Sequence, residues 1–261
     1  MSDITWSFAG KVALVSGGAS GIGRAAAAAW VAAGARVAVF DQSAERLEET
    51  AGALGREALA TVAGDVSDEG DCERAVAETL ARFARLDILL NSAGTGAMGR
   101  VWDLEPLVWD RVLAVNLRGT FLLTRAASRW MVEQKRPGRI INIASTNATV
   151  PSAGHSPYCA SKAGVVGMIL TIAAENVRHG ITANAVLPGL VATEQVRAMP
   201  AEVMQRRLEV LPAGRLIEPE EVAALVAFLA SETAGSITGE ALGIDGGMHL
   251  STVDFGSKRR V

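Results

Sequence analysis

The sequence predicts an α/β protein that forms one domain around a parallel sheet. Short runs of aliphatic and β-branched residues alternate with longer segments of helical pattern along the whole chain. No low-complexity or linker-like segment interrupts this alternation, and no repeat is evident. Strands that alternate with helices imply a parallel sheet covered on both faces. We therefore expect residues 1–261 to form a single domain.

Seven segments are predicted to be strands, because each is a short apolar run that ends at a polar or turn-forming residue. They are residues 11–15, 35–40, 58–63, 87–90, 139–144, 181–187 and 241–244. The helices between them carry recognisable ends. Gly34 closes a helix over 21–33, and Ser43 and Ser67 are predicted caps of the next two helices. A long helical region covers about 103–133, and Pro219 begins a helix that runs to about 230.

Composition excludes several classes of function. The net charge of −3 on 261 residues gives no basis for a nucleic-acid or membrane surface. The two cysteines have no metal or redox spacing, and the three histidines are scattered, so we expect no metal site. The longest apolar run, residues 163–174, is too short to span a bilayer and is predicted to be a buried helix. With no apolar signal core at the N-terminus, we expect a cytoplasmic protein.

Tyr158, the only tyrosine in the chain, is followed four residues later by Lys162. On a helix these positions share a face, so the phenol and the ammonium lie close together. A nearby positive charge favours the phenolate and lowers the pKa of tyrosine towards the range useful for general acid–base catalysis. The pattern Tyr-x-x-x-Lys also occurs by chance on ordinary helices, so other motifs have to support this interpretation.

A glycine-rich loop follows the first predicted strand and leads directly into a helix. The spacing Gly17-x-x-x-Gly21-x-Gly23 allows a tight turn and a close approach to a pyrophosphate at the helix N-terminus. The better-known spacing Gly-x-Gly-x-x-Gly occurs at residues 94–99. We do not expect this second motif to bind phosphate, because no helix is predicted to begin there.

Asp41 ends the second predicted strand, eighteen residues after Gly23. A carboxylate at this position accepts hydrogen bonds from an adenosine ribose and repels a 2′-phosphate. No lysine or arginine stands at Ser20 or Gln42 to bind that phosphate. The prediction is NAD in preference to NADP.

Taken together, these motifs resemble the short-chain dehydrogenases/reductases over nearly the whole chain. The resemblance rests on an ordered set of short motifs: Ser16-Gly17-x-x-x-Gly21-x-Gly23, Asp65-Val66, Asn91-Ser92-Ala93-Gly94, Asn116, Ser145, Tyr158-x-x-x-Lys162, Pro188-Gly189 and Thr193. The family often has threonine at Ser16 and asparagine at Ser92, and neither difference affects the chemistry.

The resemblance implies a Rossmann-type, doubly wound sheet of seven parallel strands that binds a nicotinamide cofactor. It implies catalytic roles for Asn116, Ser145, Tyr158 and Lys162. The residues expected at the cofactor are Gly17, Ser20, Gly21, Ile22, Gly23, Asp41, Asp65, Val66, Asn91, Ala93, Gly94, Tyr158, Lys162, Pro188, Gly189, Val191 and Thr193. In this scheme Tyr158 exchanges a proton with the substrate, Ser145 orients the substrate oxygen, and Asn116 holds a water that links Lys162 to solvent.

The expected function is reversible hydride transfer between NAD and a secondary alcohol or ketone, such as a small polyol, hydroxy acid or cyclic alcohol. Two alternatives remain open. The residues Asp245-Gly246-Gly247 resemble the 3-oxoacyl-carrier-protein reductases, and a non-catalytic NAD-binding sensor would share the fold. Residues 189–212 are expected to form a substrate lid, because they carry methionines and aliphatic residues suited to an adaptable apolar pocket. His155 stands near the expected substrate mouth, without a definite role.

The helix over 163–174 is apolar nearly all round, which predicts burial on every side. The sheet covers one face, so we expect a partner subunit on the other. The family's frequent tetramer agrees with this expectation. The expected partners are therefore a small alcohol or ketone and further copies of the same chain, without nucleic acid or membrane.

Overall fold

The computed structural model of the chain describes residues 6–250, and seven strands within them form one parallel sheet. The order is β3-β2-β1-β4-β5-β6-β7, so the chain starts in the middle, winds to one edge and then returns to build the other. This is the predicted doubly wound arrangement, with its reversal between β1 and β4. The strands are β1 (Val12–Ser16), β2 (Arg36–Asp41), β3 (Leu59–Ala63), β4 (Ile88–Asn91), β5 (Gly138–Ile143), β6 (Ile181–Pro188) and β7 (Ala241–Ile244).

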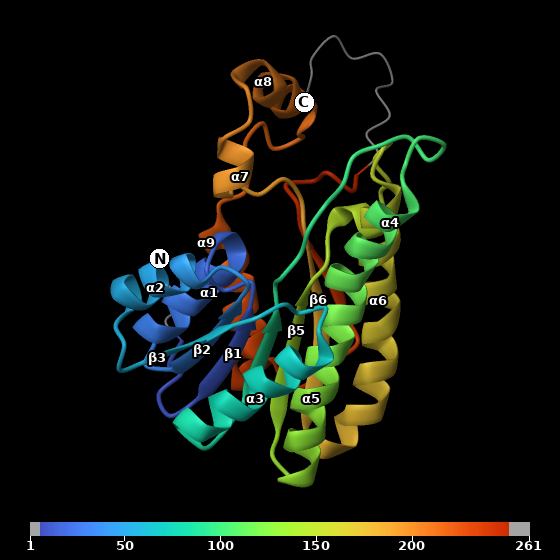
Figure 1. Cartoon of the computed structure of the whole chain (residues 1–261). Coiled ribbons are helices and arrows are strands. Elements are labelled where there is room, and N and C mark those ends of the chain that lie inside the picture. Colours follow the sequence, from blue (N-terminus) through green and yellow to red (C-terminus); the bar gives the residue numbers. More distant parts are fainter. Residues whose placement is uncertain (1–5, 251–261) are drawn as a thin grey trace.

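Helices cover both faces of this sheet (Figure 1). One face carries α1 (Gly21–Ala32), α2 (Ala44–Leu54) and α9 (Pro219–Ala230). The other carries α3 (Glu69–Phe83), α5 (Gly119–Glu133) and α6 (Ser156–Asn176), with α4 (Pro106–Leu113) leading into α5. The remaining helices α7 (Glu194–Arg197) and α8 (Ala201–Val210) stand above the carboxyl ends of the strands.

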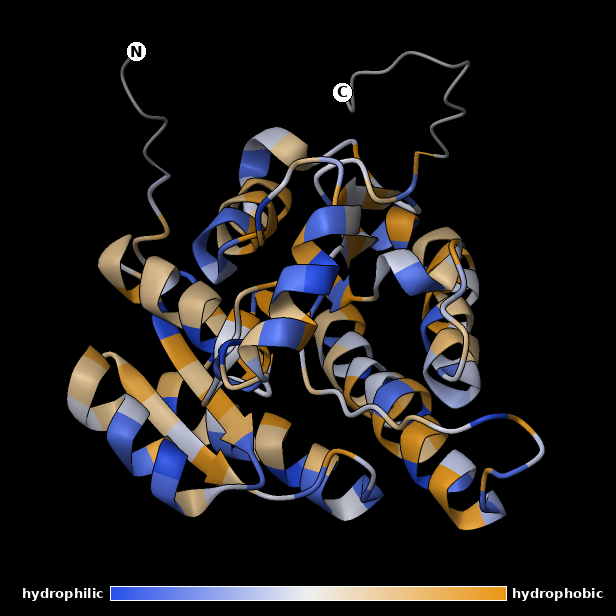
Figure 2. Cartoon of the chain, turned by 90° about the horizontal axis from the view of Figure 1, so that it is seen from above, coloured by the Kyte–Doolittle hydropathy of each residue, from blue (hydrophilic) through white to orange (hydrophobic). Residues whose placement is uncertain are grey.

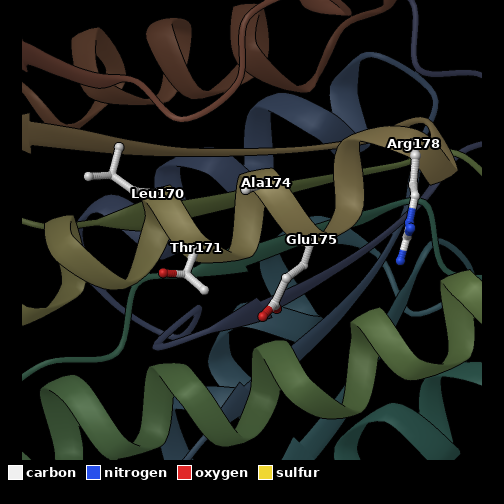
Figure 3. Close-up of a pocket in the computed structure, with 5 residues that line it drawn as sticks. All are labelled: Leu170, Thr171, Ala174, Glu175 and Arg178. Atoms are coloured by element: carbon white, nitrogen blue, oxygen red, sulfur yellow. The ribbon is translucent and has the colours of Figure 1, made fainter.

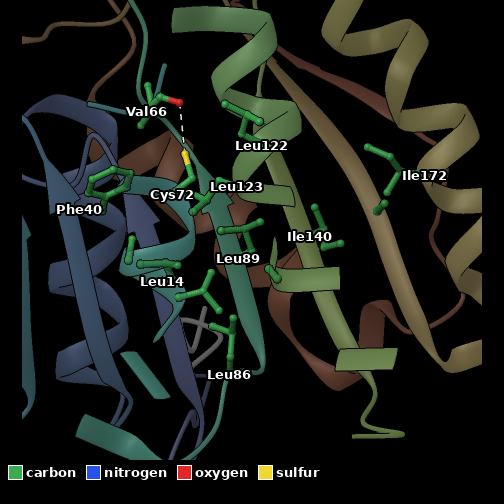
Figure 4. Packing of buried hydrophobic residues seen from close by; sticks show 14 of the residues in the cluster. Leu14, Phe40, Val66, Cys72, Leu86, Leu89, Leu122, Leu123, Ile140 and Ile172 are labelled. Carbon is green, nitrogen blue, oxygen red and sulfur yellow. Dashed lines mark hydrogen bonds between the residues drawn. The ribbon is translucent and has the colours of Figure 1, made fainter. Parts of the chain in front are cut away.

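Two hydrophobic cores follow from the alternation of side chains along each strand. In β1, Val12 and Leu14 pack towards α3 and α5, whereas Ala13 and Val15 pack towards α1 and α9. Figure 4 shows part of the first core, where Leu14, Phe40 and Leu89 meet leucines of α5. Seen from above, the strands between the helices carry mostly hydrophobic residues (Figure 2). Strands buried on both faces are the reason that their sequences are continuous apolar runs.

Cys72 belongs to this first core rather than to the surface. Its side chain is fully buried and its thiol donates to the carbonyl of Val66 at 3.2 Å, as drawn in Figure 4. Burial, reinforced by nearby aspartates, raises the pKa of Cys72 to about 12. The thiol is therefore a packing group and not a nucleophile.

Two local predictions differ in detail from the structure. Asp68, not Ser67, caps α3, because its carboxylate accepts from the amide of Asp71 at 2.9 Å while the Ser67 hydroxyl donates to Asp65. The helical region 103–133 is divided by a π-helical turn at Ala114–Arg118. Arg139 lies in β5, as predicted, and its guanidinium donates to the carbonyl of Ser231.

The apolar helix is buried on one side only. By length and composition Ser156–His179 would suffice to cross a membrane, but this segment packs along β6 as a core helix of the fold. Val165, Ile169 and Ile172 face the core, whereas Leu170 keeps 58% of its surface exposed. Burial of this helix on every side is therefore not seen among residues 6–250.

Candidate active site

Tyr158 and Lys162 lie in the first two turns of α6, at the carboxyl edge of the sheet. Pro157 in the first turn suits a helix start, and His155 occupies the N-cap position. The ammonium of Lys162 lies 5.8 Å from the centre of the Tyr158 ring, as the spacing predicted. It donates a 2.7 Å hydrogen bond to the carbonyl of Ile143, the last residue of β5. Strand β5 thus fixes the position of the lysine.

The pKa values of this pair differ from the expectation. Burial lowers the pKa of Lys162 from 10.5 to about 8, because only 4% of its surface is exposed. Burial also raises the pKa of Tyr158, and the hydrogen bond with Ser145 only partly opposes this effect. The predicted lowering by Lys162 is not seen in this structure. Desolvation outweighs the attraction between the two groups, since it favours the neutral form of both.

Ser145 follows β5 and directs its hydroxyl to Tyr158. The strand pairs with β6 up to Ile143, and a single turn of 3₁₀ helix (Thr146–Ala148) begins immediately after Ser145. The Ser145 oxygen accepts from the amide of Asn147 at 3.1 Å. Next to it, the Thr146 hydroxyl donates to the carbonyl of Pro188 at 2.9 Å, which fastens this turn to the end of β6. The hydroxyl of Ser145 is therefore held in place beside the phenol.

Asn116 lies in the π-helical turn and is completely buried. Its side-chain amide donates to the carbonyl of Thr95 at 2.9 Å and to the hydroxyl of Ser161 at 3.0 Å. Its side-chain oxygen accepts from the amide of Thr95 at 2.8 Å. The helix is thus interrupted at this asparagine, whose side chain is fully hydrogen-bonded inside the protein. π-helical turns inside α-helices often mark functional positions.

Ser161 is a site residue that the sequence reasoning missed. Its hydroxyl accepts from Asn116 and donates to the backbone carbonyl of Tyr158 at 2.8 Å. The signal was present in the sequence, because Ser161 stands three residues after Tyr158 and so shares its helix face. Together with Ser145 and Lys162, these contacts bring all four predicted catalytic residues to one place.

The glycine-rich loop after β1 forms a cradle that side chains would fill. A Cβ added at Gly17 would lie 2.7 Å from the backbone of Ala93, and one at Gly23 would lie 2.3 Å from the carbonyl oxygen of Gly17. Gly17 and Gly21 also have positive φ angles of 63° and 48°. The turn therefore requires glycine at these positions, and it presents the N-terminus of α1 towards the carboxyl edge. Ser20 is the N-cap residue of α1, and Ile22 packs against the second core.

Asp41 ends β2 beside this loop. One carboxylate oxygen accepts from the amide of Ala19 at 3.3 Å, and the other accepts from the amide of Ser43 at 3.1 Å. The side chain is half-buried, so the carboxylate retains free acceptor capacity at the edge of the loop.

Asp65 and Val66 follow β3 and lie on the side of the sheet that α3, α4 and α5 cover. Burial by itself would raise the pKa of Asp65, but the hydrogen bonds from Ser67 and the ion pair with Arg111 lower it overall. Arg111 reaches across from α4, 3.0 Å from the carboxylate. The carbonyl of Val66 lies so close to Gly119 that a Cβ there would come within 2.9 Å of it.

Other predicted cofactor residues contribute in different ways. The side chain of Asn91 lies between the sheet and α5, where its amide donates to Thr124 of α5 at 2.9 Å and to Asn142 of β5 at 2.7 Å. The side chain of Val191 is buried in the second core. Neither side chain lies at the open carboxyl edge of the sheet. Both residues therefore shape that edge through their backbone and not through their side chains. Thr193 caps α7, and its methyl carbon would lie 3.1 Å from a Cβ at Gly21.

The Gly-x-Gly-x-x-Gly motif at residues 94–99 lies in a loop, and no helix begins before α4 at Pro106. The structure thus agrees that it is not a helix-capping phosphate loop. Gly94 instead borders the predicted catalytic group: a Cβ there would lie 3.5 Å from both the Asn116 oxygen and the Lys162 nitrogen. Pro188 and Gly189 end β6 on the far side of the same edge, where Gly189 approaches Asp245 and Met248.

Within residues 6–250, no group of three or more His, Cys, Asp or Glu side chains could hold a metal ion. The polar groups around Tyr158 are amides, hydroxyls and one buried amine, and the carboxylates of Asp41 and Asp65 follow β2 and β3. This set suits proton transfer and hydrogen bonding to an organic cofactor.

Comparisons with known proteins show the family of the chain. The family model described as Enoyl-(Acyl carrier protein) reductase matches residues 17–249. D-threitol dehydrogenase of Mycolicibacterium smegmatis is 42% identical over 248 residues, covering 94% of this chain and 95% of that protein. The 3-oxoacyl-(acyl-carrier-protein) reductase FabG of Salmonella typhimurium is 38% identical, covering 94% of this chain and 99% of that protein.

Solved structures show the same relationship. A short chain dehydrogenase from Bacillus anthracis superposes with a TM-score of 0.88 at 34% identity, covering 94% of this chain and 98% of that one. The similarity to these proteins in sequence and in fold therefore extends over almost the entire length of the chain. The chain belongs to the short-chain dehydrogenase/reductase family of NAD(P)-dependent oxidoreductases that act on alcohols and ketones.

Proposed function

We propose that this protein oxidises a secondary alcohol to a ketone, reversibly, with NAD as the hydride acceptor. The observation that carries the proposal is the convergence of Asn116, Ser145, Tyr158 and Lys162 at the carboxyl edge, beside the glycine cradle. A protein that only binds the cofactor needs no such proton-transfer group. The convergence therefore favours an enzyme over a sensor.

In this proposal Tyr158, as phenolate, takes the hydroxyl proton of the substrate, and the Ser145 hydroxyl donates to the substrate oxygen. NAD, when bound, accepts the carbinol hydride. The proton then leaves Tyr158 towards Lys162, and Asn116 holds the water that connects Lys162 to solvent. In the reduction direction Tyr158 returns the proton to the alkoxide. A lysine whose pKa is about 8 exchanges protons readily near neutral pH.

The residues around the glycine cradle suit a dinucleotide. Gly17, Gly21 and Gly23 leave open the space that side chains would fill. Asp41 has acceptor capacity for a ribose hydroxyl and would repel a 2′-phosphate, which supports NAD over NADP. Asp65 would bind the cofactor through its carboxylate. The other predicted cofactor residues outside α6 would bind it through their backbone groups.

The relatives support two classes of substrate. A small polyol is supported by the D-threitol dehydrogenase, and a 3-oxoacyl thioester on a carrier protein is supported by FabG. The acidic ribose-binding position favours NAD-linked oxidation and hence the small alcohol. We also propose that the protein is a single domain. Residues 189–212 would form a lid over the substrate, because α7 and α8 stand above the carboxyl edge (Figure 1).

We also propose a cytoplasmic homotetramer. Figure 3 shows the outer face of α6, where Leu170, Thr171, Ala174, Glu175 and Arg178 line a shallow hollow of about 550 Å³. Leu170 and Val177 expose more than half of their surface here. A second α6 from another copy would cover these side chains. Size-exclusion chromatography with light scattering tests the assembly.

The function is tested by NADH formation from NAD on a panel of secondary alcohols, polyols and hydroxy acids. We expect turnover by the wild type and loss of at least about a thousandfold in Tyr158→Phe, which keeps the ring but removes the proton carrier. NAD binding by calorimetry should be similar in both proteins. Equal turnover by the two would refute the role of Tyr158, and turnover with NADP alone would refute the role of Asp41. NAD binding without turnover on any alcohol or 3-oxoacyl thioester would favour the sensor.

A further inference from the structure

The segment that carries α7 and α8 is attached to the protein chiefly at its two ends. No side chain of α7 is buried, nor is any described side chain of α8. The segment leaves the carboxyl edge at Leu190 and returns to it at Ile217. These two ends are hydrogen-bonded to each other, from the Ala192 amide to Ile217 at 2.8 Å and from the Ile217 amide to Leu190 at 3.0 Å. The hydrophobic effect therefore does little to hold the helices in place.

Two ion pairs join the beginning of this segment to helices on the body of the protein. Glu194 of α7 pairs with Arg24 in the second turn of α1. Arg197 of α7 pairs with Glu218, the N-cap residue of α9, at 2.5 Å. Arg197 also donates to the carbonyl of Ala192 at 3.0 Å. Each charged residue of α7 therefore has a partner of opposite sign on a different element.

The pairs border one groove of about 520 Å³ between α1, α2, α7 and α9. At its inner end the methyl group of Thr193 meets the backbone of Gly21, where a Cβ would lie 3.1 Å away. Gly21 is the first residue of α1 and part of the glycine cradle. The Arg24–Glu194 pair thus joins the residue next to Thr193 to a residue one helical turn after Gly21. The ion pair therefore bears on the distance between Thr193 and Gly21.

We propose that Arg24 and Glu194 are positioning residues, which hold Thr193 against the glycine cradle and so couple cofactor affinity to closure of residues 194–210. This rests on the proposed function for its cofactor, although the contact itself does not. Breaking the pair lets α7 move away from α1. The cofactor then loses the contact on the side of Thr193, whereas the proton-transfer group on α6 is unchanged. The expected signature is a higher KM for NAD at nearly constant kcat.

The size of the effect follows from exposure. The side chains of Arg24 and Glu194 are 44% and 55% exposed, so solvent screens the attraction and such pairs alter an equilibrium by about two- to fivefold. We therefore expect Arg24→Gln and Glu194→Gln each to raise the KM for NAD by about threefold. The double variant should resemble either single one, because the second change breaks a pair that is already lost.

Hydrogen exchange gives a readout that needs no turnover. Backbone amides of residues 194–210 should exchange about threefold faster in either single variant than in the wild type, without cofactor present. The exchanged-charge variant, Arg24→Glu with Glu194→Arg, should restore slow exchange. Arg56→Gln is the control, since it breaks an exposed ion pair with Glu48 that involves no residue of α1 or α7.

Each outcome decides the proposal. Faster exchange in the single variants, its reversal in the exchanged-charge variant and non-additive KM values would confirm the positioning role. Single variants that behave like Arg56→Gln, or effects that add in the double variant, would overturn it. If the wild type shows no turnover with NAD, the proposed function fails, and the exchange data still decide whether the pair holds the segment.

Discussion

The side-chain amide of Asn116 donates a 3.0 Å hydrogen bond to the hydroxyl of Ser161, and this contact joins the π-helical turn to α6 at the candidate site. Ser161 passes the connection on to the carbonyl of Tyr158. The π-helical turn supplies the geometry, because its extra residue turns Asn116 inward towards α6. The position of the phenol therefore depends on a residue forty-two positions earlier in the chain.

Removing the hydroxyl of Ser161 should test this connection. We expect Ser161→Ala to lower the free energy of unfolding by about 1 kcal/mol, since one donor and one acceptor lose their partner. Turnover should fall about three- to tenfold as Tyr158 loses its support, with little change in the KM for NAD. Urea denaturation and steady-state kinetics give both values. Ser128→Ala is the control, because the Ser128 hydroxyl is buried without a partner among the described residues. Equal effects in the two variants would contradict the prediction.

Ser145 should shift the pH dependence of alcohol oxidation. Its hydrogen bond lowers the pKa of Tyr158 against the opposing effect of burial. Ser145→Ala removes this bond, so the pKa rises and the phenolate forms at higher pH. The rising limb of kcat/KM against pH should move to higher pH than in the wild type, and the plateau should fall about a hundredfold. A limb that stays in place, or moves to lower pH, would show that Ser145 does not contact the phenol in solution.

Lys162 should make the stability of the protein depend on pH. Its pKa is 10.5 when exposed and about 8 in the folded protein, so between these values the unfolded chain binds the extra proton. The cost of burying the charge is therefore absent above about pH 10.5 and complete below about pH 8. It amounts to about 3 kcal/mol.

Lys162→Met lacks this cost. We expect its free energy of unfolding, relative to that of the wild type, to increase by about 3 kcal/mol between pH 10.5 and pH 8 and to remain constant below. The hydrogen bond to Ile143 is lost at every pH and changes only the offset. Denaturant titrations of both proteins at several pH values give the curve. A difference that does not vary with pH would mean that Lys162 keeps its ordinary pKa.

The sequence predicted the sheet well because the decisive signals are local. Apolar runs gave the strands, and polar or glycine residues immediately after them gave the carboxyl edge. What could not be predicted depends on distant contacts. Ser67 and Asp68 are both residue types that cap helices well. Asp68 caps α3 because the Ser67 hydroxyl already donates to Asp65. The π-helical turn leaves no mark in the periodicity of residues 103–133.

The same limit applies to the chemistry of the site. The spacing of Tyr158 and Lys162 places them on one helix face, but the spacing carries no information on burial. The structure shows that both are desolvated, so that burial and not mutual attraction dominates their pKa values. Likewise, an apolar helix surface predicts burial on every side, whereas Leu170 of α6 is exposed among the described residues.

Asp41 should control the choice between the two nicotinamide cofactors. A carboxylate that accepts from a ribose hydroxyl makes a charge-assisted hydrogen bond, and its loss costs about 1.5–3 kcal/mol. We expect Asp41→Ala to raise the KM for NAD roughly tenfold or more and to lower that for NADP, since the repulsion of a 2′-phosphate is removed. Initial rates with each cofactor measure the ratio. A wild type that already prefers NADP, or a ratio unchanged by the substitution, would contradict the prediction.

A pair of glycine substitutions should have opposite effects on stability, although both place alanine in a helix. At Gly23 a Cβ would lie 2.3 Å from the Gly17 carbonyl, which is backbone and cannot move without opening the cradle. At Gly52, in α2, nothing lies within 4 Å of the added carbon. We expect Gly52→Ala to raise the free energy of unfolding by about 0.5–1 kcal/mol, the usual gain of alanine over glycine in a helix.

Gly23→Ala should lower the free energy of unfolding by about 1–3 kcal/mol, the usual cost of overpacking, and should weaken NAD binding. Thermal unfolding with and without NAD measures both effects, because at a fixed concentration a ligand that binds more tightly raises the melting temperature more. A Gly23→Ala protein that is as stable as the wild type and equally stabilised by NAD would mean that the loop after β1 is not the rigid cradle on which the cofactor assignment depends.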